Sequence, residues 1–189
     1  MNEKRLPNVR VFIAIEFPEK ITTALSAIQQ EIRSKVEKGR FKRSENFHLT
    51  LKFLGETEAQ TMEKLAERLQ LVAENQQEFG LQLGQTGVFG TRMPIKVIWL
   101  GFAGKLNSLK RLQQAVETEC TDAGFTSERR IYSPHITLAQ DVTPRPGELF
   151  LPNDLPNLSF TVREFALVLS EERDRKRHYT PLYVFRLGP

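Results

Sequence analysis

The stretch Phe47-His48-Leu49-Thr50-Leu51-Lys52-Phe53 alternates apolar and polar residues with the two-residue period of a β-strand. Successive side chains of a strand point to opposite faces, so His48 and Thr50 share one face and the two leucines share the other. On this period Lys52 also lies on the histidine face, and the phenylalanines at both ends pack into the core. The stretch therefore predicts a half-buried strand that presents an imidazole and a hydroxyl side by side.

A second stretch repeats this pattern. Ser133-Pro134-His135-Ile136-Thr137-Leu138-Ala139 again places a histidine and a threonine on one face and apolar residues on the other. The chain has three histidines, and two of them stand in this context. The repetition predicts two related halves, each contributing one strand to a shared cleft.

Two imidazoles facing one cleft suit phosphodiester chemistry that needs no metal. One imidazole must accept a proton from the attacking nucleophile, and the other must donate a proton to the leaving oxygen. Histidine serves both tasks, because its ordinary pKa of about 6.5 allows either form near neutral pH. The hydroxyls of Thr50 and Thr137 can donate hydrogen bonds to the non-bridging phosphate oxygens.

Metal-dependent alternatives have weaker support. A zinc site built from His48, His135 and His178 is conceivable, but His178 lies in a charged stretch without a matching motif, which favours a surface histidine. No two of the four aspartates have the spacing of a Mg²⁺ site. Cys120 falls on the apolar face of a predicted helix, which favours a buried thiol over a nucleophile. We expect no metal and no cofactor.

The rest of the chain has the periodicities of an α+β protein with mixed sheets. A helix is expected to begin at Pro18 and end at Gly39, a second to begin at a capping box over 57–60, and a third to span 106–120. Further strands are expected over 9–15, 79–83, 96–102, 132–139, 159–169 and 179–187, with Gly84, Gly87 and Gly90 in a turn-rich connection.

Length and composition restrict the class of protein. The 189 residues are 40 % hydrophobic and 26 % charged, as in ordinary globular domains, and a single domain over residues 1–189 is expected. No apolar run approaches the roughly 20 residues of a membrane span, and Met1–Pro7 lacks the apolar core of a signal peptide. One cysteine fits a reducing compartment, so we expect a cytoplasmic protein. The size of the chain and the lack of an obvious interface stripe favour a monomer.

Positive charge is concentrated in one segment. The net charge is +4, and residues 33–43 carry six basic side chains against one acidic side chain. Such a run is typical of a solvated surface, but its position before the first histidine motif also suits RNA binding, with the salt dependence that this implies. A second cluster, over 171–177, mixes both signs.

Four segments together resemble a known family. Arg10–Ile15, Glu45–Glu56, Val97–Gly101 and Ser133–Ala139 are similar to motif regions of the two-histidine phosphoesterases, specifically the bacterial RNA 2′,3′-cyclic phosphodiesterases, also called 2′-5′ RNA ligases. The resemblance implies two pseudo-symmetric lobes, each a mixed or antiparallel sheet with helices outside, around a cleft. It implies metal-free hydrolysis of 2′,3′-cyclic RNA ends, including those of tRNA fragments, to 2′-phosphates. His48 would then be the proton donor and His135 the proton acceptor.

The chain also departs from the family pattern. Gln140 stands where the family often has an arginine, and Phe41 and Ser44 stand where it often has tryptophan and proline. Arg130 or Arg129 is a candidate for the missing cation, and Lys52 is a further candidate contact to the substrate.

Other functions remain open from the sequence. Reversible 2′-5′ ligation of RNA and hydrolysis of a small cyclic nucleotide would use the same site. A noncatalytic module that binds RNA ends is the alternative of another class, although binding alone does not require two proton-transfer groups.

Overall fold

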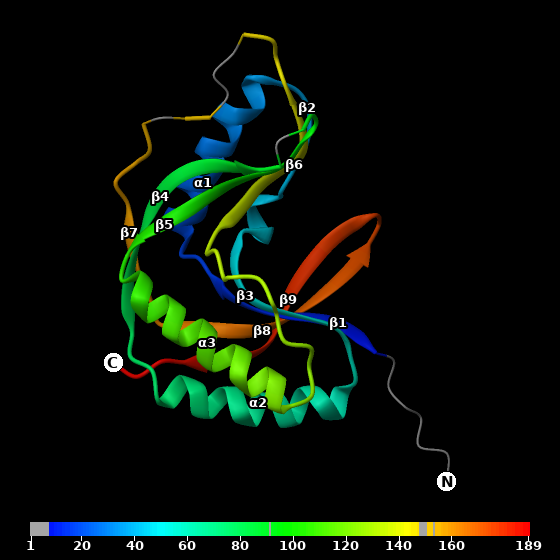
Figure 1. The fold of residues 1–189 in the computed structure, drawn as a ribbon, viewed down its shortest axis with the longest axis vertical. Helices are drawn as coiled ribbons and strands as arrows, with labels where there is room; N and C mark the ends of the chain where they lie inside the picture. The colour runs from blue at the N-terminus through cyan, green and yellow to red at the C-terminus, as the bar shows by residue number, and fades with distance from the viewer. Residues whose placement is uncertain (1–7, 91, 148–150, 153) are drawn as a thin grey trace.

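Two antiparallel sheets form the framework of the structure (Figure 1), a computed structural model that describes residues 8–90, 92–147, 151–152 and 154–189. The first sheet has the order β3 (His48–Thr57), β1 (Val9–Glu16), β8 (Glu164–Arg173) and β9 (Lys176–Arg186). The second has the order β2 (Val36–Phe41), β6 (Ile136–Pro144), β5 (Ile95–Gly104), β4 (Phe79–Phe89) and β7 (Ser159–Val162). The segment Met1–Pro7, which is not expected to be a signal peptide, lies outside the described residues.

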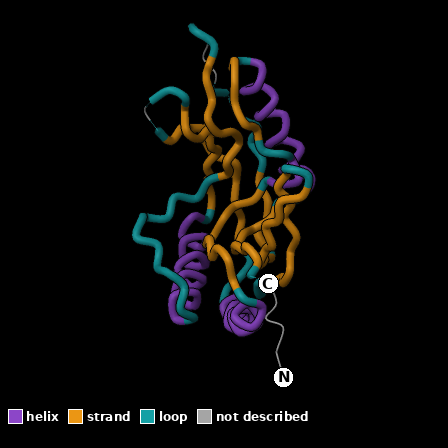
Figure 2. The backbone as a smooth tube through the Cα atoms, turned by 90° about the vertical axis from the view of Figure 1, so that its right-hand side faces the viewer, coloured by secondary structure: helices purple, strands orange, loops and turns teal. Residues whose placement is uncertain are grey.

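Helices cover the outer faces of both sheets. α1 (Glu19–Ser34) packs on the second sheet, and α2 (Ala59–Glu74) and α3 (Leu106–Asp122) pack on the first. Figure 2 shows α1 at one end of the long axis and the other two helices at the opposite end. The predicted apolar faces of α1 and α3 are buried, including the Cys120 thiol, whose pKa burial raises to about 12. These features confirm the α+β prediction, and every pairing between the named strands is antiparallel.

The two lobes do not correspond to the two halves of the chain. β1 and β3 belong to the first sheet, whereas α1 and β2, which lie between them in sequence, belong to the second lobe. The predicted strand over 159–169 is two strands. β7 pairs in the second sheet and β8 in the first, and Arg163 alone separates them. Each lobe is therefore assembled from segments spread along the whole chain.

The predicted boundaries of the first two helices were wrong. α1 ends at Ser34, and the following residues form the edge strand β2, in which Gly39 packs against the side chain of Val142. The predicted capping box does not form, because Thr57 is the last residue of β3 and its hydroxyl donates to the Gly55 carbonyl. In both places, pairing within a sheet overrides the local helical signal.

The predicted glycine-rich connection is mostly strand. β4 continues to Phe89, so Gly84 and Gly87 lie within it. Of these three glycines, Gly90 alone adopts a positive φ, of 95°. Gly87 is needed for packing, because a Cβ there would lie 2.3 Å from the Trp99 ring. The absence of a side chain leaves room for the indole ring beside the strand.

Candidate active site

The two motif histidines share the same local arrangement. His48 Nδ1 lies 2.9 Å from the Asn46 carbonyl oxygen, and His135 Nδ1 lies 2.7 Å from the Ser133 carbonyl oxygen. A carbonyl oxygen can only accept a hydrogen bond, so each Nδ1 carries the proton that it donates. Nε2 is then the atom of each ring that is left to exchange a proton with a bound molecule.

The structure brings both motifs together from different sheets. His48 begins β3 of the first sheet, and His135 directly precedes β6 of the second. The charge of His135 is close enough to lower the pKa of His48. The hydroxyl of Tyr132 donates to the Thr50 carbonyl oxygen at 3.0 Å, which ties the two motif segments to each other.

The threonines lie where the alternation predicts. Thr50 and Thr137 are each half-buried, whereas the apolar residues on either side of them are buried in the core. Each motif thus presents a histidine and a threonine on one face, as the period of two requires.

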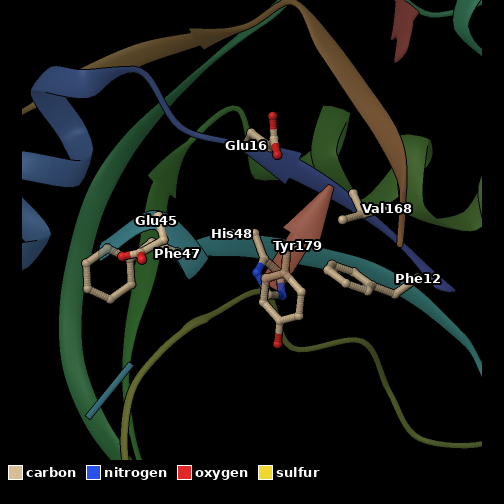
Figure 3. Close-up of a pocket in the computed structure, with 7 residues that line it drawn as sticks. All are labelled: Phe12, Glu16, Glu45, Phe47, His48, Val168 and Tyr179. Atoms are coloured by element: carbon tan, nitrogen blue, oxygen red, sulfur yellow. The ribbon is translucent and has the colours of Figure 1, made fainter. Parts of the chain in front are cut away.

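Aromatic rings enclose His48. The ring centroids of Phe12 and Tyr179 lie 4.7 Å and 5.1 Å from the centroid of the imidazole, and Val168 completes the apolar wall. Figure 3 shows the Tyr179 ring lying across His48, with Phe12 beside them and Glu16 directed away. Burial is the main cause that lowers the pKa of His48 to about 4. Positive charge on Lys42 or His135 acts in the same direction, and the hydrogen bond to the Asn46 carbonyl opposes it.

His135 has a different aromatic neighbour. The Phe89 ring meets its imidazole edge-on, with centroids 5.0 Å apart, and Trp99 packs on Phe89 at 5.3 Å. Phe89 and Trp99 thus form an aromatic layer beside one histidine. Tyr132 spans the two motif segments through its hydroxyl.

The depressed pKa of His48 predicts acid sensitivity of the fold. The unfolded chain takes up a proton at this residue below about pH 6.5, whereas the native state does so only below about pH 4. Between these values the unfolded state binds more protons, so the free energy of unfolding falls as the pH falls. We expect a loss of about 2–3 kcal/mol from His48 between pH 7 and pH 4.5.

Urea unfolding at both pH values measures this loss. His48→Gln is expected to flatten the pH dependence by about that amount. Equal pH dependence in wild type and His48→Gln would contradict the prediction.

Gly87→Ala is expected to destabilise the second lobe by about 1–3 kcal/mol, because the new methyl group overpacks the Trp99 ring. Trp99 is the only tryptophan of the chain, so its fluorescence emission reports the displacement directly. Gly80→Ala is the matched control on the same strand, since its Cβ would meet nothing within 4 Å. An unchanged emission spectrum in Gly87→Ala would show that the indole does not depend on this glycine.

Two residues of the first motif do not lie where the alternation predicts. Lys52 is buried and forms an ion pair with Glu117, with 2.7 Å between Nζ and Oε1, so its predicted place on the histidine face is wrong. Phe53, expected in the core, is 70 % exposed and its ring lies 6.2 Å from Phe12. The cause is a β-bulge in β3. Ile13 pairs with Lys52 and Ala14 with Thr50, so Leu51 has no partner residue on β1 and the side chains directly after it point to the opposite faces of the sheet.

Among the described residues, no hydrogen bond, ion pair or aromatic contact joins the other candidate residues to either motif histidine. Arg129 and Arg130 are exposed on the loop between α3 and β6, where the backbone N–H of Arg130 donates to Glu128. His178 lies on β9 opposite Glu171. Within the described ranges, no three His, Cys, Asp or Glu side chains gather as a metal site would require.

Three residues of the site were not predicted from the sequence. Tyr179 and Phe12 were assigned only to strands, and Lys42 was counted only as one member of the basic run. Their positions depend on which strands pair, since β1 lies between β3 and β8 and β9 follows β8. The aromatic and cationic character of these residues is visible in the sequence, but nothing there indicates that they meet.

The chain is similar to known proteins over most of its length. Residues 15–99 match the family model described as LigT like Phosphoesterase. An RNA 2′,3′-cyclic phosphodiesterase of Methanothermobacter thermautotrophicus is 30 % identical over 184 residues, 95 % of this chain and 99 % of that protein. No helix in the described part of the chain is long and apolar enough to cross a bilayer.

Solved structures share the fold over nearly the whole length. TT0787 of Thermus thermophilus superposes with a TM-score of 0.82 at 27 % identity, covering 95 % of this chain and 98 % of that one. LigT of Escherichia coli, crystallised with NADP⁺, superposes with a TM-score of 0.80 at 28 % identity, covering 97 % and 100 %.

Proposed function

The chain belongs to the LigT-like phosphoesterase family, and we propose on that premise that it hydrolyses the 2′,3′-cyclic phosphate ends of RNA to 2′-phosphomonoesters. The observation that carries the proposal is the matched pair of histidines. Each is fixed by an Nδ1 bond to a carbonyl two residues earlier, each leaves Nε2 available, and the two come from different sheets. A site that only bound RNA would not require this pairing.

The reaction divides between the two imidazoles. His135 Nε2 accepts a proton from water as the water oxygen attacks phosphorus. The bond between phosphorus and the 3′ oxygen breaks, and His48 Nε2 donates a proton to that oxygen. The phosphate remains on the 2′ oxygen. The hydroxyls of Thr50 and Thr137 donate to the non-bridging oxygens, where negative charge increases in the transition state.

His48 must be protonated to act as the donor. In the free protein its pKa of about 4 keeps it neutral near pH 7. A cyclic phosphate carries one negative charge, and an anion beside an imidazole raises its pKa. The substrate itself therefore promotes the protonated form of the acid that the reaction requires.

Several further properties follow from the proposal. Because both histidines come from one chain, we take residues 1–189 as one bilobal catalytic domain that acts as a monomer. The partner is RNA with a cyclic end, tRNA fragments included, without a metal or cofactor. The lone buried cysteine fits a cytoplasmic protein.

The test is turnover of a short RNA ending in a 2′,3′-cyclic phosphate, in EDTA and in water enriched in ¹⁸O. We expect a 2′-phosphate, identified by ³¹P NMR, with one ¹⁸O atom in the phosphate. A 3′-phosphate product, or activity only after a divalent metal is added, would contradict the proposal. Tight binding of the RNA end without turnover would also overturn it and favour the noncatalytic module.

A further inference from the structure

A cation without a carboxylate partner lies beside the candidate active site. Lys42 follows β2, and its backbone N–H donates to the Leu138 carbonyl oxygen of the second motif at 3.1 Å. The Lys42 carbonyl oxygen in turn accepts a 2.8 Å bond from the side chain of Gln29. These bonds hold the half-buried lysine against β6, and its charge lowers the pKa of His48.

The nearest arginines of the basic run form ion pairs, but Lys42 does not. Arg40 pairs with Asp141, and Arg43 pairs with Glu45. Among the described residues, no carboxylate lies within 4.0 Å of the Lys42 ammonium group. Burial and the charges of Arg40 and Arg177 lower its pKa. An anion bound here would relieve the repulsion among these cations.

Arg177, on β9, lies beside the first histidine motif although it is far from that motif in the sequence. The side chain of Asn46, two residues before His48, donates to the Arg177 carbonyl oxygen at 2.9 Å and so fixes β9 beside the first motif. The guanidinium lies 3.5 Å from Glu172, with both side chains largely exposed, and its charge acts on Lys42 and on Tyr179. The two charged clusters of the sequence thus meet at the His48 side of the site.

We propose that Lys42 and Arg177 bind the phosphodiester that joins the terminal nucleotide of the RNA to the one before it. This inference rests on the proposed function. The cyclic phosphate itself must lie between the two Nε2 atoms and the threonine hydroxyls. Lys42, bonded to Leu138 of the second motif, and Arg177, bonded to Asn46 beside the first motif, are therefore left for the next phosphate along the strand. The enzyme then prefers an oligonucleotide over a mononucleotide with the same cyclic end.

The test compares kcat/KM for a mononucleotide 2′,3′-cyclic phosphate with that for a dinucleotide with the same end. In Lys42→Met the preference for the dinucleotide is expected to fall about tenfold, the size of one charge-assisted hydrogen bond, and in Arg177→Met by a smaller factor. Lys38→Met, an exposed lysine of β2, is the matched control and should keep the preference of the wild type.

A dinucleotide whose internal phosphate is replaced by an uncharged methylphosphonate gives the second measurement. For wild type, kcat/KM on this substrate should fall to about the value for the mononucleotide. For Lys42→Met, which already lacks the cation, removal of the internal charge should change kcat/KM little. Equal losses of Lys42→Met on mononucleotide and dinucleotide would overturn the inference, because Lys42 would then serve the cyclic phosphate. Wild type that turns over neither substrate would overturn the proposed function, and this inference with it.

Discussion

Replacing His48 or His135 with alanine is expected to lower kcat on a cyclic RNA end by about 10²–10⁴-fold each, because each change removes one of the two proton transfers. The double variant should be little worse than either single variant, since the two groups act in one step. Steady-state kinetics in EDTA measures the losses. His178→Ala, which lies outside the pair, is the control and should retain activity.

A substrate with sulfur in place of the 3′ oxygen separates the two roles. A thiolate leaves without help from an acid, so the loss caused by His48→Ala should shrink while the loss caused by His135→Ala persists. If the loss caused by His135→Ala shrank instead, His135 would be the acid and His48 the base. Undiminished losses for both variants would contradict a division into acid and base.

The sequence predicts this site well where the signal is local. A histidine and a threonine two residues apart share a face in any strand, so both motifs could be read from periodicity alone. The enclosure of His48 could not, because Phe12 and Tyr179 lie on separate strands whose order in the sheet is a tertiary property. The role of Lys42 could not be predicted from the sequence either, because it depends on the ion pairs that Arg40 and Arg43 form with carboxylates.

The bulge at Leu51 marks the limit of periodicity within a single strand. One extra residue reverses the faces of the residues that directly follow it, so Phe53 becomes exposed near Phe12 and Lys52 becomes buried against α3. A buried lysine needs a partner, and the partner lies on a helix far along the chain. The fold thus places Lys52 away from the site and Lys42 beside it.

Lys52→Met is expected to destabilise the protein by about 3–5 kcal/mol, because it leaves the Glu117 carboxylate buried without its cation. Lys52 Nζ lies 2.7 Å from both Glu117 Oε1 and the Thr126 carbonyl oxygen, and the side chains of the pair are 4 % and 11 % exposed. Glu117 Oε1 also accepts the Glu128 N–H at 2.8 Å. The pair therefore holds the loop that leads from α3 towards His135.

A double-mutant cycle with urea unfolding measures the coupling. Lys52→Met combined with Glu117→Leu should recover most of the loss, since an apolar pair of similar volume replaces a buried ion pair at little cost. Lys64→Met, on the exposed side of α2, is the control and should change stability by less than about 0.5 kcal/mol. Additive losses in the double variant would show that the two side chains act independently. Recovery of stability would establish that Lys52 serves the fold, through the loop that carries the second histidine.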